Sequence, residues 1–147
     1  IFILHELAHK VIAKHYGLWA EFRLSLMGVL ITMLSIFSPI KLVSPGAVMI
    51  AGEADRKIVG KTAVAGPLTN IMLAALFSVS SFLVQDPLYA IMIWGAMLSA
   101  EISVFNLIPI SILDGTKIFW WNKRVWAAIF SASLIITIVT AMQFLFF

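Results

Sequence analysis

The pattern of hydrophobic and polar positions divides the 147-residue chain into long apolar stretches separated by short polar ones. Residues 63–84 and 125–147 contain no charged residue, and residues 88–113 contain only Glu101. Each stretch is long enough to cross a bilayer core of about 30 Å as a helix. Residues 1–16 form a further predicted helix, apolar in its first half. The pattern therefore predicts an all-α polytopic membrane protein with a bundle of about four transmembrane helices.

The region between residues 18 and 61 has a less regular pattern. Residues 24–40 are uncharged, but this length is at the short limit for a membrane span. Residues 42–50 are β-prone around a Pro-Gly turn, and residues 52–61 are predicted to form a polar loop. Two alternatives follow: a fifth transmembrane helix at residues 24–40, or a membrane-associated re-entrant and β-prone segment over about residues 24–50.

The distribution of basic residues favours the re-entrant or membrane-surface alternative. If residues 24–40 do not cross, all ten Lys and Arg residues lie on one side of the membrane. The positive-inside tendency makes that side cytoplasmic. If residues 24–40 cross, Lys10, Lys14 and Arg23 lie on the side opposite the other seven.

Composition supports a multi-pass protein of the cell membrane, with the lipid bilayer as its partner. The chain is 62% hydrophobic and 12% charged, whereas a soluble domain is about a quarter charged. It lacks cysteine, which excludes disulfides and thiolate metal sites. No basic run with interleaved aromatic residues suggests nucleic acid. Because no repeat or linker divides the chain, residues 1–147 are expected to form a single intramembrane domain. The chain begins inside a predicted helix, so further sequence is expected upstream.

The sequence His5-Glu6-Leu7-Ala8-His9 is the strongest indication of chemistry. Helix positions four apart share one face, so His5 and His9 can bind one metal ion. Glu6 is close enough to accept a proton from a metal-bound water. This pattern is typical of zinc metallopeptidases, in which the glutamate is the general base. Chance matches occur, but idle ionisable groups are costly in apolar membrane sequence. The residues therefore favour a zinc site.

A catalytic zinc site needs a third protein ligand and an open position for water. Asp114 is the best candidate, because it ends the apolar run of residues 88–113 on the same side as the first helix. Pro109 before it can bend the helix, and Gly115 after it lets the backbone pass closely. Asp114 could instead cap the following segment. Glu101 could pair with a cation of another span, line a water path or stay protonated.

Three sequence elements resemble one family. They are His5-Glu6-Leu7-Ala8-His9, then Gly66-Pro67-x-x-Asn70, then Asn106-x-x-Pro109 followed by Leu113-Asp114-Gly115. In this order they resemble the site-2 protease family of intramembrane zinc metallopeptidases, in particular its archaeal or bacterial members that lack a PDZ domain. The resemblance covers about residues 1–120. Residues 18–61 are longer and more hydrophobic than the family's usual β-rich connection.

The resemblance implies a role for each matching residue. His5, His9 and Asp114 would bind one zinc ion per chain. Glu6 would be the catalytic base that activates water. Asn106 would be a second catalytic residue, beside the metal, helping to polarise the scissile carbonyl. Both Asn106 and the asparagine of the second element are also typical of interhelical hydrogen bonds.

The resemblance also implies an intramembrane zinc endopeptidase that cleaves transmembrane protein substrates, as in regulated intramembrane proteolysis. From His5 to Tyr16 is about 17 Å along a helix, so the active site would lie below the cytoplasmic surface and open toward it. The alternative is a catalytically inactive zinc-binding relative or a metal carrier. A carrier would distribute ligands along a path, and an inactive relative would lack the base, whereas Glu6 is present. The sequence does not indicate an oligomeric state.

Overall fold

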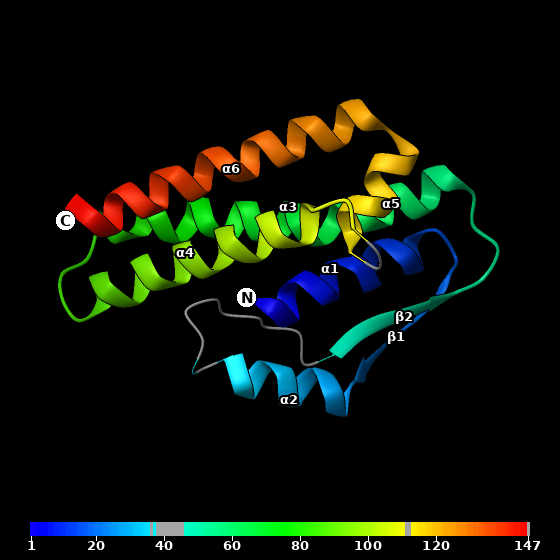
Figure 1. Cartoon of the computed structure of the whole chain (residues 1–147), viewed down its shortest axis with the longest axis horizontal. Coiled ribbons are helices and arrows are strands. Elements are labelled where there is room, and N and C mark those ends of the chain that lie inside the picture. Colours follow the sequence, from blue (N-terminus) through cyan, green and yellow to red (C-terminus); the bar gives the residue numbers. More distant parts are fainter. Residues whose placement is uncertain (36, 38–45, 111–112, 147) are drawn as a thin grey trace.

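The computed structural model describes residues 1–35, 37, 46–110 and 113–146, most of which are helical (Figure 1). In chain order, its elements are α1 (Phe2–His15), β1 (Trp19–Leu24), α2 (Leu26–Ser35), β2 (Gly46–Ala51), α3 (Arg56–Ser81), α4 (Leu88–Leu107), α5 (Asp114–Trp121) and α6 (Lys123–Phe146).

Helix α3 is the central element, and α1, α4, α5 and α6 all pack against it (Figure 1). Among the described residues, α3, α4 and α6 are the helices long and apolar enough to cross a bilayer. This is consistent with a membrane protein. Both α3 and α4 carry buried small residues, as is typical of close helix packing in membranes. These residues are Ala74, Ala96, Ser99, Ala100 and Ser103.

Several predicted boundaries were wrong. Helix α3 begins at Arg56, inside the predicted polar loop, because the Asp55 side chain accepts a hydrogen bond from the Ile58 amide at 2.7 Å and caps the helix. Helix α4 ends at Leu107 rather than near residue 113, and residues 111–112 lie outside the described residues. Residues 114–121, for which the pattern predicted no helix, form the short helix α5.

The all-α prediction also omitted a two-stranded antiparallel sheet. Strand β2 lies in the region predicted to be β-prone, and it pairs with the unpredicted strand β1, with Trp19 opposite Ala51 and Leu24 opposite Gly46. The chain therefore leaves the sheet after Leu24 and returns to the same place at Gly46.

Helix α2 follows β1 and is apolar on almost all sides. Its ten residues span about 15 Å, which is half of a bilayer core. Leu26, Met27, Met33 and Leu34 are all exposed. Residues 36 and 38–45 of the predicted re-entrant segment lie outside the described residues. Entry of this segment into a membrane stays a prediction.

A small cluster of buried residues fixes α5 against the bundle. Ala63 of α3, Leu107 of α4 and Ile118 of α5 pack together, and the Trp126 indole N–H donates to the Leu107 carbonyl at 2.8 Å. A side chain at Gly115 would collide with that same carbonyl, so glycine lets α5 start directly beneath the end of α4. This packing places the first residue of α5 next to α1.

Candidate metal centre

Three side chains predicted as metal ligands converge in the interior of the structure. His5 and His9 lie one turn apart on α1, and Asp114 is the first residue of α5. All three are buried. His9 Nε2 lies 2.9 Å from Asp114 Oδ2, His5 Nε2 lies 3.3 Å from the same oxygen, and the two Nε2 atoms are 3.1 Å apart.

This triangle of atoms has the dimensions of a zinc site. Zinc binds histidine nitrogen and carboxylate oxygen at about 2.0–2.2 Å, so neighbouring ligand atoms in a tetrahedron lie about 3.3 Å apart. The two nitrogens and one oxygen fit that spacing and the preference of zinc for such donors. Three protein ligands also leave a fourth position for water, as in catalytic rather than structural zinc sites.

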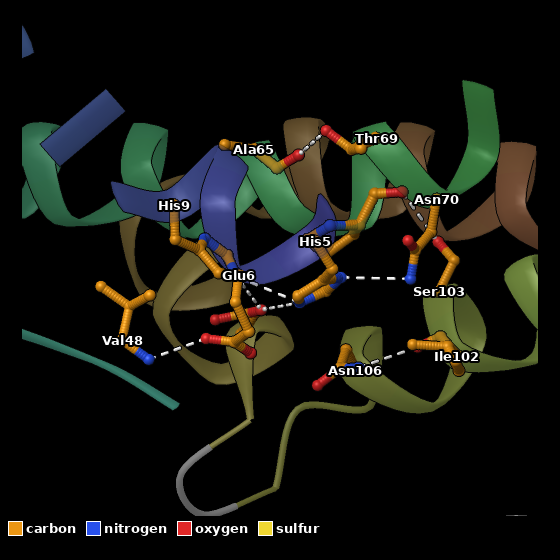
Figure 2. Close-up of polar contacts among 12 residues, drawn as sticks. His5, Glu6, His9, Val48, Ala65, Thr69, Asn70, Ile102, Ser103 and Asn106 are labelled. Carbon is orange, nitrogen blue, oxygen red and sulfur yellow. Dashed lines mark hydrogen bonds and ion pairs between the residues drawn. The ribbon is translucent and has the colours of Figure 1, made fainter. Parts of the chain in front are cut away.

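The far side of each imidazole is held by α3. His9 Nδ1 lies 2.8 Å from the Thr62 carbonyl oxygen, so the Nδ1–H donates there and Nε2 is free to bind a metal. His5 Nδ1 lies 3.2 Å from the side-chain amide nitrogen of Asn70, which points at the ring from α3 (Figure 2). Asn70 is fully buried, and its Oδ1 has no partner among the described residues.

A half-turn of the Asn70 carboxamide would give its orphaned oxygen a partner. The oxygen would then accept the Nδ1–H of His5, and His5 Nε2 would be the metal-binding atom, as for His9. From its sequence motif, Asn70 was predicted only as a residue of the second element and a candidate for interhelical hydrogen bonds. The structure places it in direct contact with one of the candidate ligands.

Gly66 forms the wall of the site on α3. A Cβ atom at this position would collide with the Nε2 atoms of both His5 and His9. The space that a side chain would fill is therefore the space around the candidate ligand atoms. From the sequence, Gly66 is recognisable only as part of a motif, because the need for glycine there depends on how closely α1 and α3 pack.

The two oxygens of Asp114 have separate partners. Oδ2 faces the histidines, and Oδ1 accepts a hydrogen bond from Lys117 Nζ at 3.1 Å. Burial raises the pKa of Asp114, but hydrogen bonds with His5 and His9 and the charge of Lys117 lower it more, so the net pKa is well below its usual value. Asp114 is thus a carboxylate, the form that binds a metal. The Asp114 side chain makes its hydrogen bonds with these partners. It therefore does not have the capping role that was considered as an alternative.

The predicted base, Glu6, is held by the sheet. Its Oε2 accepts a hydrogen bond from the backbone N–H of Val48 in β2 at 2.8 Å (Figure 2). Because this N–H points to α1, it is not used in pairing with β1. The two-stranded sheet therefore sets the position of the Glu6 carboxylate. The sequence did not reveal this contact, because it is made by the main chain of β2.

The other predicted site residue is not brought into the triangle. The Asn106 amide donates to the Ile102 carbonyl of its own helix at 2.9 Å (Figure 2). Its role beside a metal stays a prediction. Glu101 is exposed on α4.

The comparison with known proteins agrees with this geometry. Over 132 residues, the chain is 36% identical to a protein of Methanocaldococcus jannaschii named "Putative zinc metalloprotease". The match covers 87% of this chain and 69% of that protein. The chain belongs to this zinc metalloprotease family. No family model and no solved structure matches this chain.

Replacing Gly66 with alanine should weaken zinc binding by the chain without unfolding it. Alanine favours helix, so α3 should persist, while the added Cβ displaces the ligand atoms. We expect zinc affinity to fall by at least about tenfold. Metal analysis of the purified protein measures this, and circular dichroism reports the helix content. Gly95→Ala is the control, because the nearest atoms that a Cβ would meet there belong to the Phe77 ring, at 3.2 Å, and not to a candidate ligand. Unchanged zinc affinity in Gly66→Ala would contradict the placement of the site.

Replacing Val48 with proline removes the N–H that holds Glu6. We expect peptide cleavage to fall at least about tenfold, a part of the 10²–10⁴-fold that a positioned general base contributes. Zinc content should not change, because the hydrogen bond that is lost is made to Glu6 and not to a candidate ligand. Val48→Ala keeps the N–H and should retain activity. Equal cleavage rates for the proline and alanine variants would show that the contact does not position the base.

Proposed function

We propose that the chain is an intramembrane zinc endopeptidase of the site-2 protease type, which hydrolyses peptide bonds in transmembrane segments of membrane proteins. The observation that carries the proposal is the buried triangle of His5, His9 and Asp114, packed against α3, which is itself long and apolar enough to span a bilayer. The relationship to a zinc metalloprotease family supports the reaction. The apolar helices support the location.

The proposed mechanism assigns a task to each residue. A zinc ion held by the triangle would supply a Lewis acid and lower the pKa of water to about 7. Glu6 accepts the proton of the attacking water and returns it to the nitrogen of the leaving amine. Asn106, once turned away from the Ile102 carbonyl, donates a hydrogen bond to the oxygen of the scissile carbonyl. One water thereby supplies its oxygen to the scissile carbonyl carbon and, through Glu6, its proton to the leaving nitrogen.

The exposed face of α1 supports insertion of this helix into the bilayer. Ile3, Leu4, Leu7 and Val11 are all exposed and apolar. With α1 in the membrane, the domain has four membrane helices, and α2 is a re-entrant or membrane-surface element between the strands. The basic residues then lie on the cytoplasmic side, and the site opens to that side. Water reaches it over the polar end of α1.

A non-catalytic zinc protein or a metal carrier is less well supported. A carrier requires several ligand groups along its path. Within the described part of the chain, His5, His9 and Asp114 form the one group of three or more ligands close enough to bind an ion. Glu6 beside them has no task in a carrier.

Substituting Glu6 with glutamine tests the proposed reaction. Glutamine can keep a hydrogen bond to Val48 but cannot accept a proton, so cleavage of a model transmembrane peptide should fall by about 10²–10⁴-fold. Zinc content should stay near one per chain. His9→Ala should lose both zinc and cleavage. The proposal fails if Glu6→Gln cleaves at the wild-type rate, or if wild-type protein loaded with zinc does not cleave the peptide.

Single cysteines introduced into the cysteine-free chain test the proposed topology. Glu53→Cys, before α3, and Lys123→Cys, at the start of α6, should react with an impermeant thiol reagent from the cytoplasmic side. Gln85→Cys, between α3 and α4, should react from the opposite side. Ser25→Cys, before α2, should be labelled from the same side as Glu53→Cys. Labelling of Ser25→Cys and Glu53→Cys from different sides would show that residues 24–40 cross.

A further inference from the structure

The two oxygens of the Asp114 carboxylate are divided between two tasks. Oδ2 lies 2.9 and 3.3 Å from the two histidine nitrogens, whereas Oδ1 lies 3.1 Å from Lys117 Nζ. Lys117 is three residues further along α5, so its side chain reaches back over one turn of the helix. Its side chain is 46% exposed, whereas that of Asp114 is 9% exposed. Lys117 thus links a buried carboxylate to the surface.

We infer that Lys117 is a positioning residue, which keeps Asp114 a ligand through one oxygen and so keeps the fourth coordination position open. The inference rests on the proposed zinc peptidase function. A carboxylate can bind a metal through one or both oxygens. If Oδ1 also bound, it would take up space and charge that water and the substrate carbonyl need. The ammonium group holds Oδ1 by a charge-assisted hydrogen bond and prevents this.

Other groups are not available for this task in the described structure. Among the described residues, Oδ1 accepts a hydrogen bond from Lys117, and the cap of α5 at Leu113 makes no side-chain hydrogen bond. An ion pair between exposed groups contributes little to stability. Here the carboxylate is buried, so the orientation of its oxygens depends on its partners. The contact of Lys117 with Asp114 is therefore better explained as fixing the orientation of the carboxylate than as stabilising α5.

The coordination number of cobalt(II) bound in place of zinc tests the inference directly. Four-coordinate cobalt(II) has intense visible absorption, and five-coordinate cobalt(II) has weaker bands. We expect the four-coordinate spectrum for wild type and for Lys117→Arg, which keeps a cationic donor. Lys117→Met should show the weaker, five-coordinate spectrum. With zinc bound, kcat of Lys117→Met for a transmembrane peptide should fall by about 10- to 100-fold.

Lys57→Met is the matched control, because Lys57 is an exposed lysine in the first turn of α3. It should keep the wild-type spectrum and kcat. A wild-type spectrum for Lys117→Met would overturn the inference, as would the same spectral change in Lys57→Met. Complete loss of cobalt from Lys117→Met, with its helix content intact, would also overturn it, because Lys117 would then control affinity. If wild-type protein binds cobalt with the expected spectra but cleaves no peptide, the proposed function fails and the role of Lys117 in coordination stands.

Discussion

The burial of ionisable groups among apolar helices is the constraint on which the rest of the structure depends. An unpaired buried charge is so costly that it persists only with partners that satisfy it. Here each buried group has such a partner. The Thr62 carbonyl and Asn70 hold the outer nitrogens of the histidines, and Lys117 holds the outer oxygen of Asp114. The remaining ligand atoms, the two histidine Nε2 atoms and Asp114 Oδ2, face one another around a single place that a cation would fill.

Close approach of helix backbones makes this arrangement possible. Gly66 lets α3 lie directly against the histidines of α1, and Gly115 lets α5 begin beneath the end of α4. A third glycine, Gly60, lies where a Cβ would collide with the Trp121 ring of α5. These small residues add no chemistry of their own. They bring α1, α3 and α5 close enough for short side chains from two of them to meet.

Local sequence patterns were sufficient to predict the candidate ligands. His5 and His9 share a helix face by spacing alone, and Asp114 marks the end of an apolar run. Strand β1 was missed, because its partner β2 is more than 20 residues away and pairing is decided by the fold. The end of α4 was misplaced and α5 was not predicted, because an apolar run of residues does not show where its helix stops. Lys117 was counted only as a basic residue, since its contact with Asp114 depends on the position of α5.

The hydrogen bond from β2 to Glu6 has a consequence for how the two-stranded sheet can evolve. Every residue except proline supplies the same backbone N–H, so the contact does not constrain the side chain at position 48. Strand sequence can then drift among relatives while the geometry at the base is preserved. New substrate preferences could thus arise in the two strands and in α2 between them without disturbing the reaction itself.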